Sequence, residues 1–386
     1  MPIIARYAVI TGVPLALLLL GALLGGPFAV MALLWLTVIA AVMDKLLAPP
    51  PQDAGAHAPW SDRLSAVLAI GHLTLLPVVL ASLAAFEQGG GQKLALFVAT
   101  ASFFGQVSHP NAHELIHRRA LWLRGLGAAV YTSIGMGHHV SAHRLVHHRH
   151  VGTPDDPNTP LPGESFWAYV PRAHHGSFMA GLAQEVEKLD RRSDGAYSYK
   201  NPYYIWVGGA VVTLIIAGEI AGLVGIVGLI ALAALTHLQI LLSDYIQHYG
   251  LQRLELPGGR YEPVAAHHSW NAPKGFSSFL MLNAPSHSEH HLHPDRPYDQ
   301  LDTGAPAPTL PYAVPIMAML ATVPPVWHKL MDRRALRVME AAAERLQNAP
   351  PVTPRPARPR AAPATTERGT AEDADALIAR LLQSQG

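Results

Sequence analysis

The sequence predicts an all-helical integral membrane protein in which six transmembrane helices carry a histidine-rich cap on one side of the membrane. Three observations support this fold class. Half of the 386 residues are apolar and only 14% are charged, a balance typical of integral membrane proteins. Six apolar segments approach the length of about 20 residues that crosses a bilayer. The histidines gather in motifs near the ends of these segments.

The predicted spans pair into three hairpins. They cover residues 7–25, 28–47, 63–86, 92–112, 203–221 and 223–247. Gly25, Gly26 and Pro27 join the first two spans, a glycine-rich stretch at 89–91 joins the next two, and the last two meet around Gly222. Glycine and proline are typical of such turns. We therefore expect these three short connections on one side of the membrane and the longer segments on the other.

The distribution of basic residues predicts the orientation of the spans. Loop 113–202 contains ten Lys and Arg residues, whereas the short connections have almost none. Lysine and arginine are enriched in cytoplasmic loops, so we expect this loop, both chain termini and the cap to be cytoplasmic. Every histidine motif then lies on the cytoplasmic face.

The rest of the chain is assigned by composition. We expect residues 1–330 to form one membrane domain and residues 331–386 to form a cytoplasmic C-terminal tail. The apolar stretch 121–137 is rich in glycine and alanine and predicts a partly buried helix, and the four prolines in 311–330 favour a packed or interfacial segment over a seventh span. From about residue 349 the Pro/Ala-rich composition predicts disorder over most of the tail.

Nine histidines occur with the spacing of metal ligands. His113 and His117 enclose Glu114 in an HExxH group, and an i, i+4 pair lies on one face of a helix, so both imidazoles can reach one cation. His143 and His147 repeat this spacing. The other motif histidines are His148, His248, His287, His290 and His291. Nine ligands exceed what one ion coordinates, so we infer a dinuclear centre.

Composition also excludes several kinds of chemistry. The chain has no cysteine and therefore no disulfide, iron–sulfur cluster, thiolate metal site or catalytic thiol. An electron carrier with cysteine-ligated iron must be a separate protein. The formal net charge is +1, with no basic stripe among aromatic residues, so we expect a lipid membrane and no nucleic acid as a partner.

The motifs resemble those of the membrane-bound alkane 1-monooxygenases, within the wider superfamily of membrane fatty-acid desaturases and hydroxylases. The resemblance covers roughly residues 28–300. The matching stretches are HELIHR at 113–118, HRLVHHRHVGTPDDP at 143–157, DYIQHYGL at 244–251, HHSWN at 267–271 and HSEHHLHP at 287–294. The DYIQHYGL and HHSWN stretches are typical of the alkane hydroxylase branch rather than of desaturases in general.

The resemblance implies a six-span fold with a cytoplasmic histidine-rich di-iron cap, in which all nine motif histidines bind two non-haem iron ions. Carboxylates that orient ligating imidazoles are expected among Glu114, Asp155, Asp156 and Glu289. The sequence departs from the family at Ala142 and Gln247, where carboxylates are usual, and at 284–286.

Trp35 lies near the middle of the second span. It is a candidate for one wall of an apolar substrate channel, where it would limit the length of the substrate. The alternative is that its indole simply packs against neighbouring helices.

The implied reaction is O2-dependent terminal hydroxylation of a medium-chain alkane or similar alkyl group to a primary alcohol, a step of lipid metabolism. The apolar substrate would enter from a bacterial inner membrane. Electrons would come from a separate rubredoxin, reduced by an NADH-linked rubredoxin reductase. Benzylic methyl hydroxylation of the xylene type, and fatty-acyl desaturation or hydroxylation, are the alternatives within the superfamily.

Two other classes of protein use similar residues. HExxH is also typical of zinc proteases, with Glu114 as the general base, but three further histidine motifs on the same face favour the oxygenase. A metal transporter or a bis-histidine haem protein would place polar ligands near the bilayer midplane. Here the histidines cluster at one end of the spans.

Overall fold

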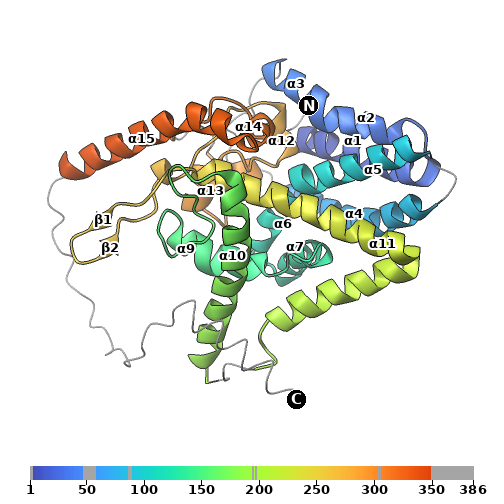
Figure 1. Cartoon of the computed structure of the whole chain (residues 1–386), viewed down its shortest axis with the longest axis horizontal. Coiled ribbons are helices and arrows are strands. Elements are labelled where there is room, and N and C mark those ends of the chain that lie inside the picture. Colours follow the sequence, from blue (N-terminus) through green and yellow to red (C-terminus); the bar gives the residue numbers. More distant parts are fainter. Residues whose placement is uncertain are drawn as a thin grey trace.

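The computed structural model describes residues 3–46, 58–85, 89–193, 195, 198–302, 304 and 306–348. This part of the chain is helical except for loops and one two-stranded hairpin (Figure 1). The hairpin pairs β1 (Glu255–Leu256) antiparallel with β2 (Arg260–Tyr261). The predicted disordered segment that begins at 349 lies outside the described residues.

Among the described residues, four helices are long and apolar enough to cross a membrane, so the chain is an integral membrane protein. They are α1 (Ile3–Leu24), the segment Phe28–Leu46, the segment Trp60–Ala84 within α4 (Ala58–Ala84), and α11 (Tyr203–His248). The segment Phe28–Leu46 comprises α2 (Phe28–Leu34), a π-helical turn (Trp35–Ile39) and α3 (Ala40–Leu46). Large apolar side chains such as Leu23, Val67 and Leu223 are exposed on these helices, as expected for surfaces that face lipid.

Helix α11 is broken in the middle. Ala221 and Gly222 have non-helical backbone angles, and Gly222 has a φ of 54°, which glycine adopts without the steric penalty of a Cβ atom. Figure 1 shows the two arms of α11 meeting at this bend. The break lies where the sequence predicts the connection between the fifth and sixth spans.

The predicted span 92–112 is helical but is not among the four helices that meet the length and hydropathy requirement. It comprises α5 (Gly90–Phe103), a π-helical turn (Phe104–Ser108) and the start of α6 (His109–Ile116). The histidine-bearing end of this segment is less apolar than its middle because it contributes to the cap. The described residues therefore contain four candidate helices, of which α11 covers the last two predicted spans, and the number of six spans stays a prediction.

The cap is built from short helices and two longer ones, α10 and α15, around one end of this bundle. It contains α7 (Leu121–Ser133), α8 (His139–Ala142), a π-helical turn (His143–His147), α9 (His148–His150), α10 (Phe166–Asp190), α12 (Phe276–Leu280), α13 (His287–Leu292), α14 (Val314–Ala321) and α15 (Pro324–Asn348). Two short 3₁₀ turns, Ala266–His268 and Tyr298–Gln300, complete it. In Figure 1, α6, α9 and α13 meet near the centre of the molecule.

Close packing fixes the helices that carry the histidine motifs. A Cβ atom on Gly127 of α7 would lie 2.8 Å from the carbonyl oxygen of Ala112 on α6, so only glycine allows this approach without displacement. At the other end of the cap, Trp327 and Met331 of α15 are fully buried. Residues 331–348 therefore form part of a packed helix.

Candidate metal centre

The structure gathers all nine motif histidines into two adjacent groups. The five-histidine group contains His113, His117, His143, His148 and His290. The four-histidine group contains His147, His248, His287 and His291. Within each group, one ring nitrogen from every residue lies within 4.8 Å of the others. This partition into two groups matches the dinuclear centre that the number of histidines predicts.

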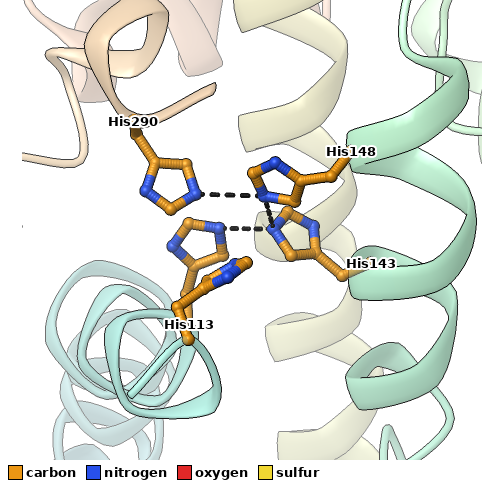
Figure 2. Close-up of side chains that lie close together, drawn as sticks. His113, His143, His148 and His290 are labelled. Atoms are coloured by element: carbon orange, nitrogen blue, oxygen red, sulfur yellow. Dashed lines mark hydrogen bonds between the residues drawn. The ribbon is translucent and has the colours of Figure 1, made fainter. Parts of the chain in front are cut away.

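In the five-histidine group, the Nε2 atoms converge on one point (Figure 2). The Nε2–Nε2 distances are 2.7 Å for His113 and His143, 2.9 Å for His143 and His148, and 3.2 Å for His148 and His290. Imidazole nitrogens lie about 2.1 Å from a bound metal ion, so two ligands at right angles are about 3.0 Å apart. The observed spacing therefore suits adjacent corners of one coordination polyhedron.

The four-histidine group repeats this arrangement. The Nε2 atom of His287 lies 2.9 Å from that of His248 and 3.1 Å from that of His291. The Nε2 atom of His147 is buried and has no hydrogen-bond partner among the described residues. A buried polar atom without a partner is destabilising, and a cation shared with the other three nitrogens would satisfy it.

The π-helical turn at His143–His147 determines which histidines of the second motif belong to the same group. His143 and His147 have the i, i+4 spacing that would let them share one cation, but they belong to different groups. A π-helical turn closes i→i+5 hydrogen bonds, so residues five apart lie above one another. His143 therefore pairs with His148, and His147 turns toward the other group.

Adjacent histidines connect the two groups. The neighbours His147 and His148 belong to different groups, and so do His290 and His291. The ring centres of His148 and His291 are 4.6 Å apart. The segments that carry His147–His148 and His290–His291 each contribute an imidazole ring to both groups. Two cations bound by these groups would therefore lie close together.

Asp156 orients one of these imidazoles. Its carboxylate accepts hydrogen bonds from Nδ1 of His147 at 2.9 Å and from the hydroxyl of Thr159 at 2.7 Å. Burial alone would raise the pKa of this carboxyl, but attraction to His147 and these hydrogen bonds outweigh it and hold the pKa below its usual range. With Nδ1 held by a carboxylate, Nε2 of His147 is directed into the four-histidine group, the arrangement that favours metal ligation.

A backbone carbonyl orients His248 in the same way. Nδ1 of His248 lies 3.2 Å from the carbonyl oxygen of His268, so Nδ1–H donates and Nε2 keeps its lone pair for the group. His268 is itself fixed, since its Nδ1 accepts from the backbone N–H of Ala265 at 2.9 Å and its Nε2 donates to Glu262 at 3.0 Å. Burial lowers the pKa of His268 to about 4. The HHSWN stretch thus supports the centre through a carbonyl, which sequence reasoning did not identify.

The other three predicted carboxylates have different partners. Glu114 is buried and bonds to Arg118 at 2.7 Å and to the backbone N–H of Tyr298 at 2.9 Å. Glu289 is paired with Arg296. Asp155 is on the surface, with 73% of its side chain exposed. Because Glu114 is engaged by Arg118, it is not placed as the general base that a zinc protease requires.

Trp35 packs against two other helices. Its Nε1 donates to the carbonyl of Ile10 at 3.1 Å, and its ring packs at 5.6 Å against Phe276. These contacts join the second apolar helix to α1 and α12.

Two of the three departures from the family pattern can be placed in their local surroundings. A Cβ atom on Gly181 of α10 would lie 3.0 Å from the backbone nitrogen of Ala142, so α10 packs closely against the backbone of α8 at this position. At the other position, the amide of Gln247 donates to the carbonyl of Ala284 at 3.0 Å and accepts from Ser243 at 2.8 Å. A glutamate could not make the first of these hydrogen bonds when ionised.

The two groups differ in exposure. All members of the four-histidine group are buried, whereas His117 and His148 of the five-histidine group are partly exposed. Nine neutral imidazoles suit borderline cations such as iron, zinc and copper.

This fold and site define an integral membrane protein with a buried polyhistidine centre suited to two cations. The sequence profile of the fatty acid desaturase family matches residues 93–319, more than half of the chain, and the matched region contains all nine histidines. The chain therefore belongs to the fatty acid desaturase family.

Among its relatives are several alkane monooxygenases. The chain is 33% identical to alkane 1-monooxygenase 1 of Alcanivorax borkumensis over 62% of this chain and 59% of that protein. It is 32% identical to alkane 1-monooxygenase of Ectopseudomonas oleovorans over 58% and 56% of the two chains. It is also 28% identical to the hydroxylase component of xylene/toluene monooxygenase of Pseudomonas putida over 59% and 60%. The chain thus aligns with somewhat more than half the length of these relatives.

Proposed function

We propose that the protein is an O2-dependent di-iron monooxygenase that hydroxylates the terminal carbon of a medium-chain alkane or a similar alkyl group to a primary alcohol. The observation that carries this proposal is the partition of nine histidines into two adjacent groups of five and four. The similarity to alkane 1-monooxygenases supports the choice of substrate class.

Each part of the chain would have a defined task in this reaction. When bound, the iron pair supplies the activation of O2 and the cleavage of the C–H bond. Asp156 and the carbonyl of His268 hold Nδ1 of His147 and His248, so both rings stay in the tautomer that presents Nε2. The apolar helices exclude water and admit an apolar substrate from the bilayer.

The partly exposed edge of the five-histidine group is where we expect electrons to enter. His117 and His148 are the members that approach solvent, and the four-histidine group is enclosed. The chain has no cysteine, so the electron carrier is a separate protein, and we propose a rubredoxin served by an NADH-linked reductase.

The proposed topology has six spans in a bacterial inner membrane. Each arm of α11 would cross once, because the break at Ala221 and Gly222 divides it. Residues 90–112 would supply the remaining span, and the cap and both termini would be cytoplasmic.

Metal analysis of the detergent-purified protein, combined with an O2-dependent assay using octane, a rubredoxin, its reductase and NADH, tests this function. We expect about two irons per chain, one for each histidine group, and the formation of 1-octanol. One zinc per chain with peptidase activity and no O2 requirement would refute the proposal.

A second candidate reaction is benzylic methyl hydroxylation. It is supported by the 28% identity to the xylene/toluene monooxygenase hydroxylase component. Two irons per chain without 1-octanol, but with oxidation of xylene to methylbenzyl alcohol, would favour it. Fatty-acyl substrates in the same assay would detect desaturation or hydroxylation.

A further inference from the structure

A buried tyrosine lies beside the five-histidine group without belonging to it. Tyr131 of α7 has no exposed surface, and its hydroxyl lies 2.9 Å from Nδ1 of His109. His109 and the neighbouring His139 are also buried, and neither is a member of the two histidine groups. The proposed hydroxylation has no use for these three residues.

Aromatic rings connect Tyr131 to the candidate ligands by two short routes. The Tyr131 ring lies 4.8 Å from that of His139, which stacks on His143 at 5.0 Å with an angle of 23° between the planes. On the other route, the ring of His109 lies 6.1 Å from that of His113. His113 and His143 are adjacent members of the five-histidine group. An electron that leaves Tyr131 would therefore cross one intervening ring to reach a ligand.

Oxidation of a phenol requires a base for its proton as well as a route for its electron. The hydrogen bond to His109 supplies this base. A phenol that loses an electron becomes strongly acidic, so its oxidation is favourable only where a base accepts the proton at once. In the tautomer with Nε2–H, Nδ1 of His109 accepts the hydrogen bond from the Tyr131 hydroxyl at 2.9 Å, and the backbone carbonyl oxygen of His109 lies farther from that hydroxyl, at 3.4 Å. The base is thus already in position, and burial prevents the proton from being lost to bulk water.

We propose that Tyr131 donates one electron to the dinuclear centre when O2 has been activated but no substrate is present. This inference rests on the proposed function. The O–H bond of Tyr131 breaks, its proton moves to Nδ1 of His109, and its electron passes through His139 or His109 to the oxidised centre. Tyr131 becomes a neutral radical and the centre is reduced by one electron.

A return step completes the cycle. One electron from the separate electron donor, together with the proton held on His109, restores the phenol. The consequence is protection of the ligands, because an activated centre that finds no C–H bond would otherwise oxidise the nearest imidazoles. Tyr131 would thereby keep the nine histidines intact during idle turnover.

The test uses the full-length iron-loaded protein in detergent. The protein is reduced under argon, mixed with O2 without alkane, frozen within milliseconds and examined by electron paramagnetic resonance. We expect a tyrosyl radical in the wild type, at least tenfold less in Tyr131→Phe, and a comparable loss in His109→Phe. Tyr245→Phe is the matched control, since the Tyr245 ring is also buried but its hydroxyl donates to the backbone carbonyl of Glu164 at 2.6 Å rather than to an imidazole. Its radical yield should equal that of the wild type.

Two further measurements complete the test, and the first of them uses the wild type alone and so does not depend on the folding of the variants. Ring-deuterated tyrosine incorporated into the wild type should narrow the radical signal, and a signal that keeps its width would overturn the proposal. Peptide mass spectrometry after idle turnover should show several times more oxidised histidine in Tyr131→Phe than in Tyr245→Phe. A protein that holds two irons and forms product but gives no radical would refute this inference alone, whereas a protein without two irons would refute the proposed function.

Discussion

Single residues decide which cation site each histidine serves. His143 and His290 belong to the five-histidine group and His248 to the four-histidine group. If each group holds one ion, replacement of any of them by alanine should lower the iron content from about two per chain toward one and abolish turnover. Iron analysis of the membrane-inserted variants measures this. His175→Ala should retain both irons, because His175 is an exposed histidine of α10 outside the groups. Full activity in the alanine variant of His143, His248 or His290 would remove that residue from the ligand set.

The neighbours Asp156 and Asp155 differ in burial and in their contact with the histidines. Asp156 is buried and bonds to Nδ1 of His147, whereas Asp155 is largely exposed. Loss of a carboxylate that orients a ligating histidine costs about 10- to 100-fold in metal affinity or activity. We therefore expect Asp156→Asn to lose iron that much more readily in a chelator competition assay. Asp155→Asn should behave as the wild type, and equal behaviour of both variants would contradict the assignment.

Sequence reasoning identified the nine histidines from spacing and resemblance, but it could not divide them correctly between two groups. The division depends on the π-helical turn at His143–His147, and that turn leaves no mark in a spacing pattern that suits an ordinary helix. The contact that His268 makes with the centre could not be predicted either. It acts through a backbone carbonyl, and any residue at that position would present one.

At the scale of helices, the contact of α6 with α7 holds the first histidine motif in place. Gly127 of α7 has no room for a Cβ atom, because it would approach the carbonyl oxygen of Ala112 and the Cβ of Leu115 to 2.8 Å. Gly125 lies on the same helix and a Cβ there would meet nothing within 4 Å. The two glycines therefore separate the effect of helix propensity from the effect of packing.

We expect Gly127→Ala to destabilise the protein by about 1–3 kcal/mol through overpacking. Gly125→Ala should be neutral or stabilise it by up to about 1 kcal/mol, since alanine favours helix more than glycine. Thermal unfolding in detergent, with iron retention measured on the same samples, distinguishes them. A Gly127→Ala protein as stable as the Gly125→Ala protein would show that α6 and α7 are not packed this closely.

The break in α11 shows what sequence could predict about whole helices. The position of Gly222 between two apolar runs predicted a connection, and the structure has its break at Ala221 and Gly222. The predicted span 92–112 is not among the four candidate helices, because its C-terminal part lies in the cap as the start of α6. Hydropathy alone cannot separate an apolar helix in lipid from one that ends among buried histidines.

For the whole molecule, the absence of cysteine allows a direct test of the proposed topology. Single cysteines can be introduced at exposed positions without background labelling. Gln92 lies near the start of α5, and Glu219 lies just before the break in α11. If both arms of α11 cross the membrane, its two ends, at Tyr203 and His248, lie on the same side, and Glu219 must lie on the other.

A maleimide that does not cross membranes should therefore label Gln92→Cys and Glu219→Cys in intact spheroplasts. Arg192→Cys and Glu344→Cys, exposed in the cap, should react only after the membrane is permeabilised, because the ten basic residues of loop 113–202 favour the cytoplasmic side. Labelling of all four in intact spheroplasts would exclude the cytoplasmic cap. Labelling of Gln92→Cys without labelling of Glu219→Cys would instead show that the two arms of α11 do not both cross the membrane. The number of spans would then be smaller than six, but the assignment of the histidine centre would not change.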